Sequence, residues 1–468
     1  MSSPFTPASL EAIDQASLFH PVSSIADQQQ NGPYIIDSAQ GVQVTDHKGR
    51  TLIDMGAGLW CVNVGYGRAE LADAAADAMR RLSYQHLFGG AASEPAIRLA
   101  DRLLTLFRDT VSQDMARVFF GTSGSDANDT AFKLVRYYHN LIGKPAKKKI
   151  ISRQGAYHGV SYASGSLTGI SSYHQMFDQP VADVLHTSCP HHYRFAHDGE
   201  SEADFSARMI AEVAALIERE GPETIGAFIA EPVMGTGGVL LPPAGYFEGL
   251  QKLLAQHDIL LIVDEVITGF GRTGHWFGSG KYGLKPDIVS LAKGVTSAYF
   301  PLSATIISNR LWQALAQASP KTGTFMHGFT YSGHPVGCAV ALANLDILEQ
   351  EQLVARANQQ GDLLLERLRA RLGGHPFVGD IRGSGLMVGV ELIADRATRR
   401  AFAPQAAPHR IVAREATEQG VLARALPYLP VNSFSPPLII GEAELEEAVE
   451  RYVTALERVT PQLKALAG

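Results

Sequence analysis

The stretch Ile259-Leu260-Leu261-Ile262-Val263-Asp264-Glu265 decides the fold of this chain. An apolar run that ends in two acidic residues is typical of a strand buried on both faces of a sheet, with its last residues at a polar edge. The segment Asp287-Ile288-Val289-Ser290-Leu291-Ala292-Lys293-Gly294 has the same form, except that a lysine follows the apolar run. Two such strands in succession predict an α/β protein with a mostly parallel sheet covered on both faces.

Outward from this stretch, the chain up to residue 334 alternates between apolar runs of strand length and segments with helical periodicity. Further strands are expected at 117–120, 149–152 and 225–230, and helices at 70–82, 96–107, 126–141, 205–218 and 246–257. Glycines or polar residues follow each of these strands. Because the carboxyl ends of parallel strands meet at one edge, where such sheets bind ligands, we expect a functional site there.

The pattern changes after residue 335. Helices are expected at 336–350, 362–372, 410–419 and 442–455, one strand at 382–392 and a short strand at 421–424. These elements predict a second, smaller α+β lobe, which the chain enters at 334–337. The polar first thirty residues are interpreted as an arm that leads into short strands at 34–36 and 42–45.

Composition excludes several classes of protein. Of the 468 residues, 40 are Lys or Arg and 47 are Asp or Glu, a net charge of −7 that argues against nucleic acid or an anionic membrane as the main partner. No run approaches the roughly 18 apolar residues of a membrane span. Met1-Ser2-Ser3-Pro4 lacks the features of a signal peptide. The three cysteines, Cys61, Cys189 and Cys338, are far apart, which fits a cytoplasmic protein without disulfides.

The segment Gly121-Thr122-Ser123-Gly124-Ser125-Asp126 lies between a predicted strand and a predicted helix. Glycines allow a tight turn, hydroxyls donate hydrogen bonds, and the helix N-terminus attracts anions, so the segment suits a phosphate. A Ser or Asp helix cap beside turn glycines explains the same residues. The segment matches neither the P-loop nor the dinucleotide fingerprint, which disfavours a nucleotide cofactor.

Asp264 follows the apolar run 259–263, and Lys293 follows the apolar run 288–292. A carboxylate at the end of a buried strand is either a solvated terminus or the partner of a buried cation, such as a protonated ring nitrogen. Most lysines are surface charges, but one that follows an apolar run and precedes Gly294 can lose its proton and form a Schiff base with a carbonyl. The side chain of Glu265 is expected to point to the side of the strand opposite that of Asp264, and it is interpreted as structural.

A phosphate cradle, a buried aspartate and a Schiff-base lysine on successive strand ends are together what pyridoxal 5′-phosphate (PLP) requires. With further motifs, these residues resemble class III (subgroup II) PLP-dependent aminotransferases, and most closely the ω-amine:pyruvate transaminases. The resemblance extends from about residue 15 to residue 460. The motifs that carry it are 58–60, 121–128, 156–159, 230–235, 264–274, 292–294 and 327–335.

The resemblance implies PLP fold type I, the aspartate aminotransferase-like fold, with a mostly parallel seven-stranded sheet in the large domain. The implied domains are an N-terminal arm with part of the small domain at 1–65, a large PLP-binding domain at 66–334 and a C-terminal small domain at 335–468. It also implies a homodimer, or a tetramer, whose active sites are shared between subunits.

The resemblance further assigns roles to residues near the cofactor. Lys293 is implied to form the aldimine and to move the proton, and Asp264 to bind the pyridine nitrogen. Tyr157 and Val266 are implied to lie on the two faces of the ring, and Thr330 to reach the phosphate of the neighbouring subunit. The remaining implied cofactor-binding residues are Ser123, Gly124, Ser125, His158, Glu231 and Phe329.

For the substrate, the resemblance implies that Trp60 and Phe88 form the aromatic walls of the pocket, although core packing explains both. Arg424 matches the mobile arginine that binds the acceptor's carboxylate. The segment 425–437 departs from the family pattern, since it is longer and richer in proline. A zinc site around Cys189-Pro190-His191-His192 is rejected, because the spacing fits no standard structural pattern.

The implied reaction moves an amino group from an amine or ω-amino acid to a 2-oxo acid, pyruvate in the first interpretation, with pyridoxamine phosphate as the intermediate form. The alternatives are another class III enzyme, either an aminomutase or a 2-oxoglutarate-dependent diamine or ω-amino acid aminotransferase. A non-catalytic PLP-binding protein is the alternative from a different class.

Overall fold

The largest sheet of the protein has seven strands in the order β4-β10-β9-β8-β7-β5-β6. The structure is a computed structural model that describes residues 9–468, so the prediction about Met1–Pro4 lies outside the described residues. The strands of this sheet are β4 (Met115–Gly121), β5 (Lys149–Arg153), β6 (Val184–Thr187), β7 (Ile225–Ala230), β8 (Leu260–Asp264), β9 (Ile288–Leu291) and β10 (Ser303–Ser308).

Six of the seven strands run in the same direction. The pairs β6–β5, β5–β7, β7–β8 and β8–β9 are parallel. Strand β10 is antiparallel to both β9 and β4, so β4 runs the same way as β9. The mostly parallel sheet predicted from the sequence is confirmed, and the carboxyl ends of β4, β5, β7, β8 and β9 share one edge.

Side chains of this sheet alternate between two apolar cores. In β8, Leu261 and Val263 pack with one core, and Leu260 and Ile262 pack with the core on the other face. The period of two in a strand sends neighbouring side chains to opposite faces, and an unbroken apolar run is therefore needed where both faces are covered. This is why the stretch 259–263 indicates the fold.

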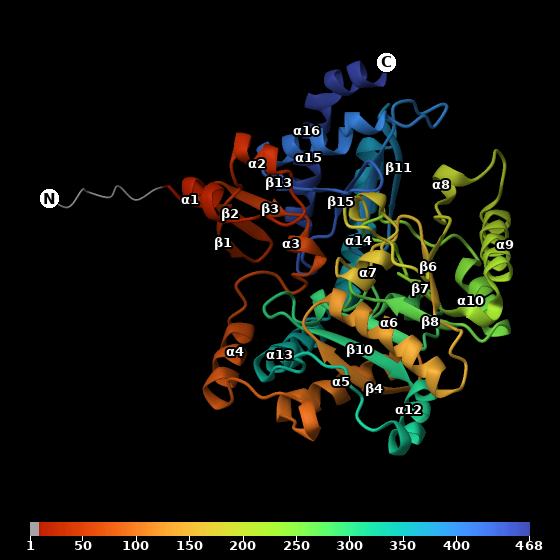
Figure 1. The fold of residues 1–468 in the computed structure, drawn as a ribbon. Helices are drawn as coiled ribbons and strands as arrows, with labels where there is room; N and C mark the ends of the chain where they lie inside the picture. The colour runs from red at the N-terminus through yellow and green to blue at the C-terminus, as the bar shows by residue number, and fades with distance from the viewer. Residues whose placement is uncertain (1–8) are drawn as a thin grey trace.

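Helices cover both faces of the sheet (Figure 1). Helices α9 and α10 pack on one core and α6 and α12 on the other, while α4, α5 and α13 pack together beside β4. These helices are α4 (Ala69–Arg81), α5 (Glu94–Thr110), α6 (Gly124–Leu141), α9 (Glu202–Glu220), α10 (Tyr246–Gln256), α12 (Asn309–Thr322) and α13 (Pro335–Gln350). Short helices are α3 (Ala57–Trp60), α7 (Tyr162–Leu167), α8 (His192–Phe195) and α11 (Gly278–Lys281).

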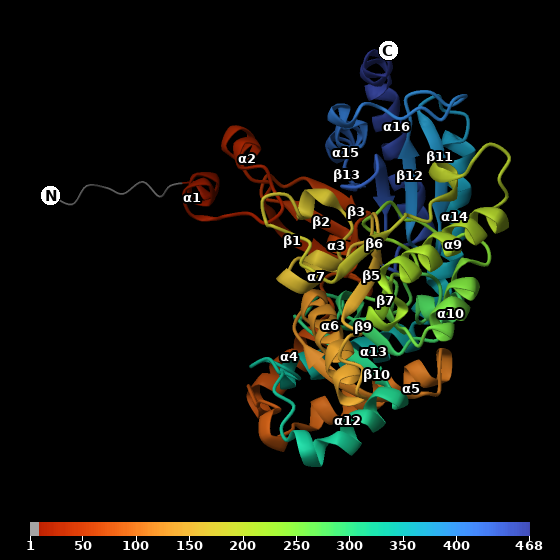
Figure 2. The ribbon, with the colours of Figure 1, turned by 45° about the vertical axis from the view of Figure 1, so that its right-hand side comes forward.

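Two four-stranded sheets complete the fold, in the orders β1-β2-β3-β13 and β11-β12-β15-β14. Their strands are β1 (Ile36–Gln40), β2 (Gln43–Asp46), β3 (Thr51–Asp54), β11 (Val378–Gly383), β12 (Val388–Leu392), β13 (Val421–Leu422), β14 (Arg424–Ala425) and β15 (Val431–Phe434). They pack with α14 (Leu353–Leu372), α15 (Pro408–Glu418) and α16 (Glu442–Ala467). Parallel pairing of β3 with β13 joins an early strand of the chain to a late one, and the two labels lie next to each other in Figure 2.

Three expectations for the outer parts of the chain were wrong in detail. The single strand expected at 382–392 is a hairpin of β11 and β12, because Gly385 takes φ +55° and turns the chain back. The N-terminal arm contains α1 (Leu10–Ser17) and α2 (Ile25–Asn31). Helix α16 continues past residue 455 to Ala467, because Leu463 and Ala467 are buried in the core. The predicted domain boundaries at 65 and 334 stay predictions. No helix of residues 9–468 combines the length and apolarity of a membrane span.

A buried ionic cluster ties α8 and His191, the residue before it, to strands β11 and β12. The Glu391 carboxylate in β12 is inaccessible to solvent and accepts hydrogen bonds from Arg382, at 2.6 Å, from His191, at 3.1 Å, and from Arg194. Burial alone would raise the pKa of Glu391, but the Arg382, His191 and Arg194 side chains hold it well below its usual value. The Glu391 carboxylate therefore stays ionised near neutral pH.

We expect Glu391→Ala to destabilise the protein by about 3–5 kcal/mol, because Arg194 would lose its anion and Arg382 would keep only Asp380, at 2.8 Å. The measurement is the urea midpoint at fixed protein concentration. Glu248→Ala is the matched control, since Glu248 pairs with Lys252 on the exposed face of α10 and should cause little change. Equal midpoints for the two variants would contradict this account.

Candidate active site

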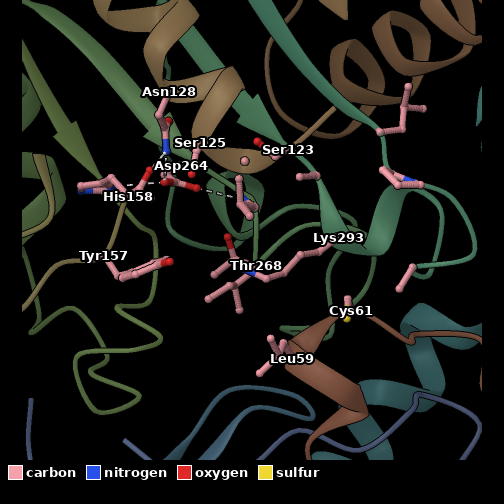
Figure 3. Close-up of a pocket in the computed structure, with 18 of the residues that line it drawn as sticks. Leu59, Cys61, Ser123, Ser125, Asn128, Tyr157, His158, Asp264, Thr268 and Lys293 are labelled. Atoms are coloured by element: carbon pink, nitrogen blue, oxygen red, sulfur yellow. Dashed lines mark hydrogen bonds and ion pairs between the residues drawn. The ribbon is translucent and has the colours of Figure 1, made fainter. Parts of the chain in front are cut away.

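A cavity of about 400 Å³ lies at the edge where the parallel strands end (Figure 3). Most of its lining comes from the ends of β4, β5, β7, β8 and β9 and the residues that follow them, as predicted for this edge, and Leu59 and Cys61 at α3 complete it. The predicted site residues in the lining are Ser123, Gly124, Ser125, Tyr157, His158, Glu231, Asp264, Val266 and Lys293. The fold therefore brings nine residues from five separate loops into one cavity.

The N-terminus of α6 forms one wall of the cavity. The Ser123 hydroxyl caps the helix by accepting from the Asp126 N–H at 3.2 Å, so the helix-cap interpretation of this segment holds. The first N–H groups of a helix have no carbonyl partner within it and carry positive potential, so this end remains suited to a phosphate. A Cβ at Gly124 would lie 3.0 Å from Val266, which explains the glycine at the start of the helix.

Asp264 is the buried acid of the cavity, with 4 % of its surface exposed. Its Oδ2 accepts from the Asn128 amide at 2.7 Å and lies 2.9 Å from His158 Nδ1, while Oδ1 accepts from the Val266 N–H at 3.0 Å. A carboxylate only accepts, so His158 Nδ1 carries the hydrogen of that bond. No lysine or arginine of residues 9–468 lies within ion-pair distance of Asp264, so the site suits a cationic ligand atom such as a protonated pyridine nitrogen.

Lys293 enters the cavity from the end of β9, opposite Tyr157 (Figure 3). Its backbone takes φ +48°, a left-handed conformation that is strained for a lysine. The buried Asn344 side chain of α13 holds the following turn by donating to the carbonyls of Gly294, at 2.9 Å, and Val295, at 3.0 Å. Burial lowers the pKa of Lys293, against the opposing effect of Asp264, which makes the amine available as a nucleophile and base.

Tyr157 and Glu231 form the side of the cavity next to β7. Burial raises the pKa of the Tyr157 phenol to about 12, so this group stays protonated near neutral pH. The Glu231 carboxylate accepts from the backbone N–H groups of Tyr157, at 3.1 Å, and Gly235, at 2.8 Å, and burial raises its pKa. Glu231 thus fixes the loop that carries Tyr157.

Trp60 and Arg424 lie next to the cavity but do not line it in this chain. The Trp60 ring is buried among Val233, Ile267 and other apolar side chains, and the Arg424 guanidinium lies over it at 5.8 Å. Within residues 9–468, no carboxylate lies at ion-pair distance from Arg424, and burial lowers its pKa. A partly buried guanidinium without an acid partner is available to a carboxylate ligand.

Phe88, Phe329 and Thr330 lie outside the cavity lining. The Phe88 side chain is half exposed, Thr330 is exposed, and the Thr330 carbonyl accepts from Tyr84. Their predicted contacts with cofactor or substrate would need a second chain, so these roles stay predictions.

Asn128 is the residue that sequence reasoning missed. It sits on the buried face of α6, and its amide donates both to Asp264 and to the His158 carbonyl, each at 2.7 Å. A polar residue on the apolar face of a predicted helix was the available signal. The residues considered for zinc have other partners: His191 pairs with Glu391, and His192 with the Glu200 carbonyl.

The fold and the site define a PLP-dependent enzyme of fold type I. A buried carboxylate that pairs with no lysine or arginine of residues 9–468 fits the pyridinium, a buried lysine with a lowered pKa fits the aldehyde, and a helix N-terminus fits the phosphate. The model of the family "Aminotransferase class-III" matches residues 24–456, and the chain belongs to this family. The family uses PLP, so the predicted fold, enzyme class and cofactor are confirmed.

Known relatives are named for several substrates. The structure of the omega transaminase from Pseudomonas jessenii in complex with PMP matches with a TM-score of 0.94 and 44% identity, over 97% of this chain and 99% of that one. The diaminobutyrate–2-oxoglutarate transaminase of Halomonas elongata is 45% identical, over 92% of this chain and 91% of its own. Gamma aminobutyrate transaminase 1 of Solanum lycopersicum is 43% identical, over 93% of this chain and 83% of its own.

We expect Asn128→Ala to weaken PLP binding about tenfold or more, because a hydrogen bond to a charged group contributes about 1.5–3 kcal/mol. Asn128→Asp should weaken it further, since a second carboxylate would face Asp264. The dissociation constant is measured by titrating the apo protein with PLP and following absorbance. Unchanged affinity in both variants would mean that Asn128 does not support Asp264.

Proposed function

We propose that this enzyme transfers the amino group of a primary amine or ω-amino acid to a 2-oxo acid, with pyruvate as the acceptor. The convergence of Lys293, Asp264 and the α6 N-terminus in one cavity carries the proposal. The likeness to omega transaminase structures supports the amine donor.

In this proposal, the residues that line the cavity bind different parts of the cofactor. When bound, PLP supplies an aldehyde that combines with amines and a ring that accepts the electron pair left by deprotonation. Lys293 Nζ would hold the aldehyde carbon of the cofactor and would act as the base that accepts and returns a proton. Asp264 would bind the protonated ring nitrogen, while Ser123, Gly124 and Ser125 would bind the phosphate. Tyr157 and Val266 would hold the ring, and His158 and Glu231 would support Asp264 and Tyr157.

Arg424 is the basis for choosing pyruvate. One guanidinium beside the cavity matches an acceptor with one carboxylate. The second carboxylate of 2-oxoglutarate needs another cation, and within the described residues the cavity lining contains no arginine. The 2-oxoglutarate-dependent reaction is the second candidate, because one relative is named for that acceptor.

The proposal includes a homodimer, in which Phe88, Phe329 and Thr330 of one subunit complete the site of the other. Exposed apolar side chains around these residues support it, since Met326 is 85% exposed and Tyr331 59% exposed. A cytoplasmic location is also proposed, supported by the free thiols of Cys61, Cys189 and Cys338.

The test follows amino transfer from 1-phenylethylamine or β-alanine, with pyruvate or 2-oxoglutarate as acceptor. We expect pyruvate to give a kcat/KM about tenfold higher or more, because an unpaired carboxylate is costly to bury. Lys293→Ala should abolish turnover, whereas Lys252→Ala, at an exposed lysine, should not. A preference for 2-oxoglutarate would favour the second candidate, and full activity of Lys293→Ala would refute the site.

The rate of PLP capture by the apo protein should rise with pH, with a midpoint below 10.5, the ordinary pKa of a lysine. The reason is that only the unprotonated amine attacks the aldehyde, and burial makes Lys293 lose its proton more easily. Stopped-flow absorbance measures the rate. A midpoint at the ordinary lysine value would show that burial does not activate Lys293.

A further inference from the structure

The β14–β15 hairpin carries Arg424 at one end and a proline-rich tip at the other. Arg424 pairs with Ser433 and Ala425 with Asn432, and the tip spans residues 426–430. The Leu426 N–H donates to the Val431 carbonyl at 2.9 Å, which closes the tip. Only Ala425 separates Arg424 from the tip, so the position of the tip constrains the backbone of Arg424.

The tip rests on the loop that follows β5. A Cβ placed on Gly155 would lie 2.5 Å from Tyr428 Cε1 and 2.8 Å from Cδ1, so the Tyr428 ring lies directly against this glycine. Gly155 has φ +78°, and its N–H donates to the Gly169 carbonyl at 2.8 Å, so the surface under the ring is a fixed turn. Tyr428 and Leu429 also pack on the apolar cluster of Ala156, Cys189, Met234 and Leu240.

The same loop carries Tyr157, two positions after Gly155. Glu231 fixes this part of the loop through the Tyr157 N–H. At the start of the tip, Leu426 belongs to the apolar cluster that contains Trp60, over which the Arg424 guanidinium lies. The contact between Tyr428 and Gly155 is therefore a direct link between the strand that carries Arg424 and the loop that carries Tyr157.

We infer that Tyr428 is a positioning residue for carboxylate recognition: its ring, seated on Gly155, sets where Arg424 stands relative to Tyr157 and the cavity. This inference rests on the proposed function, in which Arg424 binds the carboxylate of the acceptor. A guanidinium displaced by about 1 Å loses most of a bidentate contact. An amine without a carboxylate makes no such contact, and its binding does not depend on the hairpin.

The experiment compares wild-type holoenzyme with Tyr428→Ala and Tyr428→Phe, using pyruvate and 1-phenylethylamine. We expect Tyr428→Ala to raise the KM for pyruvate about tenfold, with the KM for the amine nearly unchanged. Tyr428→Phe should behave as wild type, because it keeps the ring. The dissociation constant of propionate, a carboxylate that cannot react, should rise in parallel and is measured by the change in cofactor absorbance.

A double-mutant cycle with Arg424→Ala separates positioning from general packing. In the Arg424→Ala background, Tyr428→Ala should cause no further loss of pyruvate or propionate binding. Equal effects on pyruvate and the amine, additive losses in the double variant, or no effect of Tyr428→Ala would overturn the inference. Failure of the proposed function is distinguishable, since Arg424→Ala alone would then leave pyruvate binding unchanged.

Discussion

The carboxylate of Asp264 is the constraint on which the rest of the site depends. A buried negative charge is tolerated only where donors surround it, and here they come from three places: Asn128 of α6, His158 after β5, and the backbone after β8. None of these donors is a lysine or arginine. The family's cofactor brings the missing cation, a protonated ring nitrogen. These donors stabilise the Asp264 carboxylate in the folded protein. The same carboxylate remains suited to a cationic ring.

Lys293 illustrates how the fold maintains a strained residue. Its left-handed backbone conformation would be unfavourable in isolation, but Asn344 holds the turn that follows, and Gly294 packs against Asn63 where no side chain would fit. A lysine in this conformation can reach back into the cavity instead of continuing along the strand. The strain at the end of β9 and the lowered pKa of the amine therefore belong to the same arrangement.

Much of this was predictable from local patterns. The apolar run before Asp264 indicated a doubly covered strand, and the polar residues after each strand indicated the edge where the site lies. Strands β6 and β10 escaped prediction, because short runs such as Val184–Thr187 mix polar and apolar residues that only sheet pairing holds extended. The hairpin at Gly385 escaped because one glycine within an apolar segment does not indicate the direction in which the chain continues.

The class of sheet, the edge where the candidate site lies and the residue types suited to its chemistry were predictable from the sequence alone, since strand burial and side-chain chemistry are local properties. The tertiary structure was needed to show that Asn128 supports Asp264, that Arg424 lies over Trp60 with no acid partner among residues 9–468, and that Tyr428 rests on Gly155. Each of these contacts joins residues far apart in the chain. Their distances depend on how helices, strands and loops pack, and no local pattern encodes that packing.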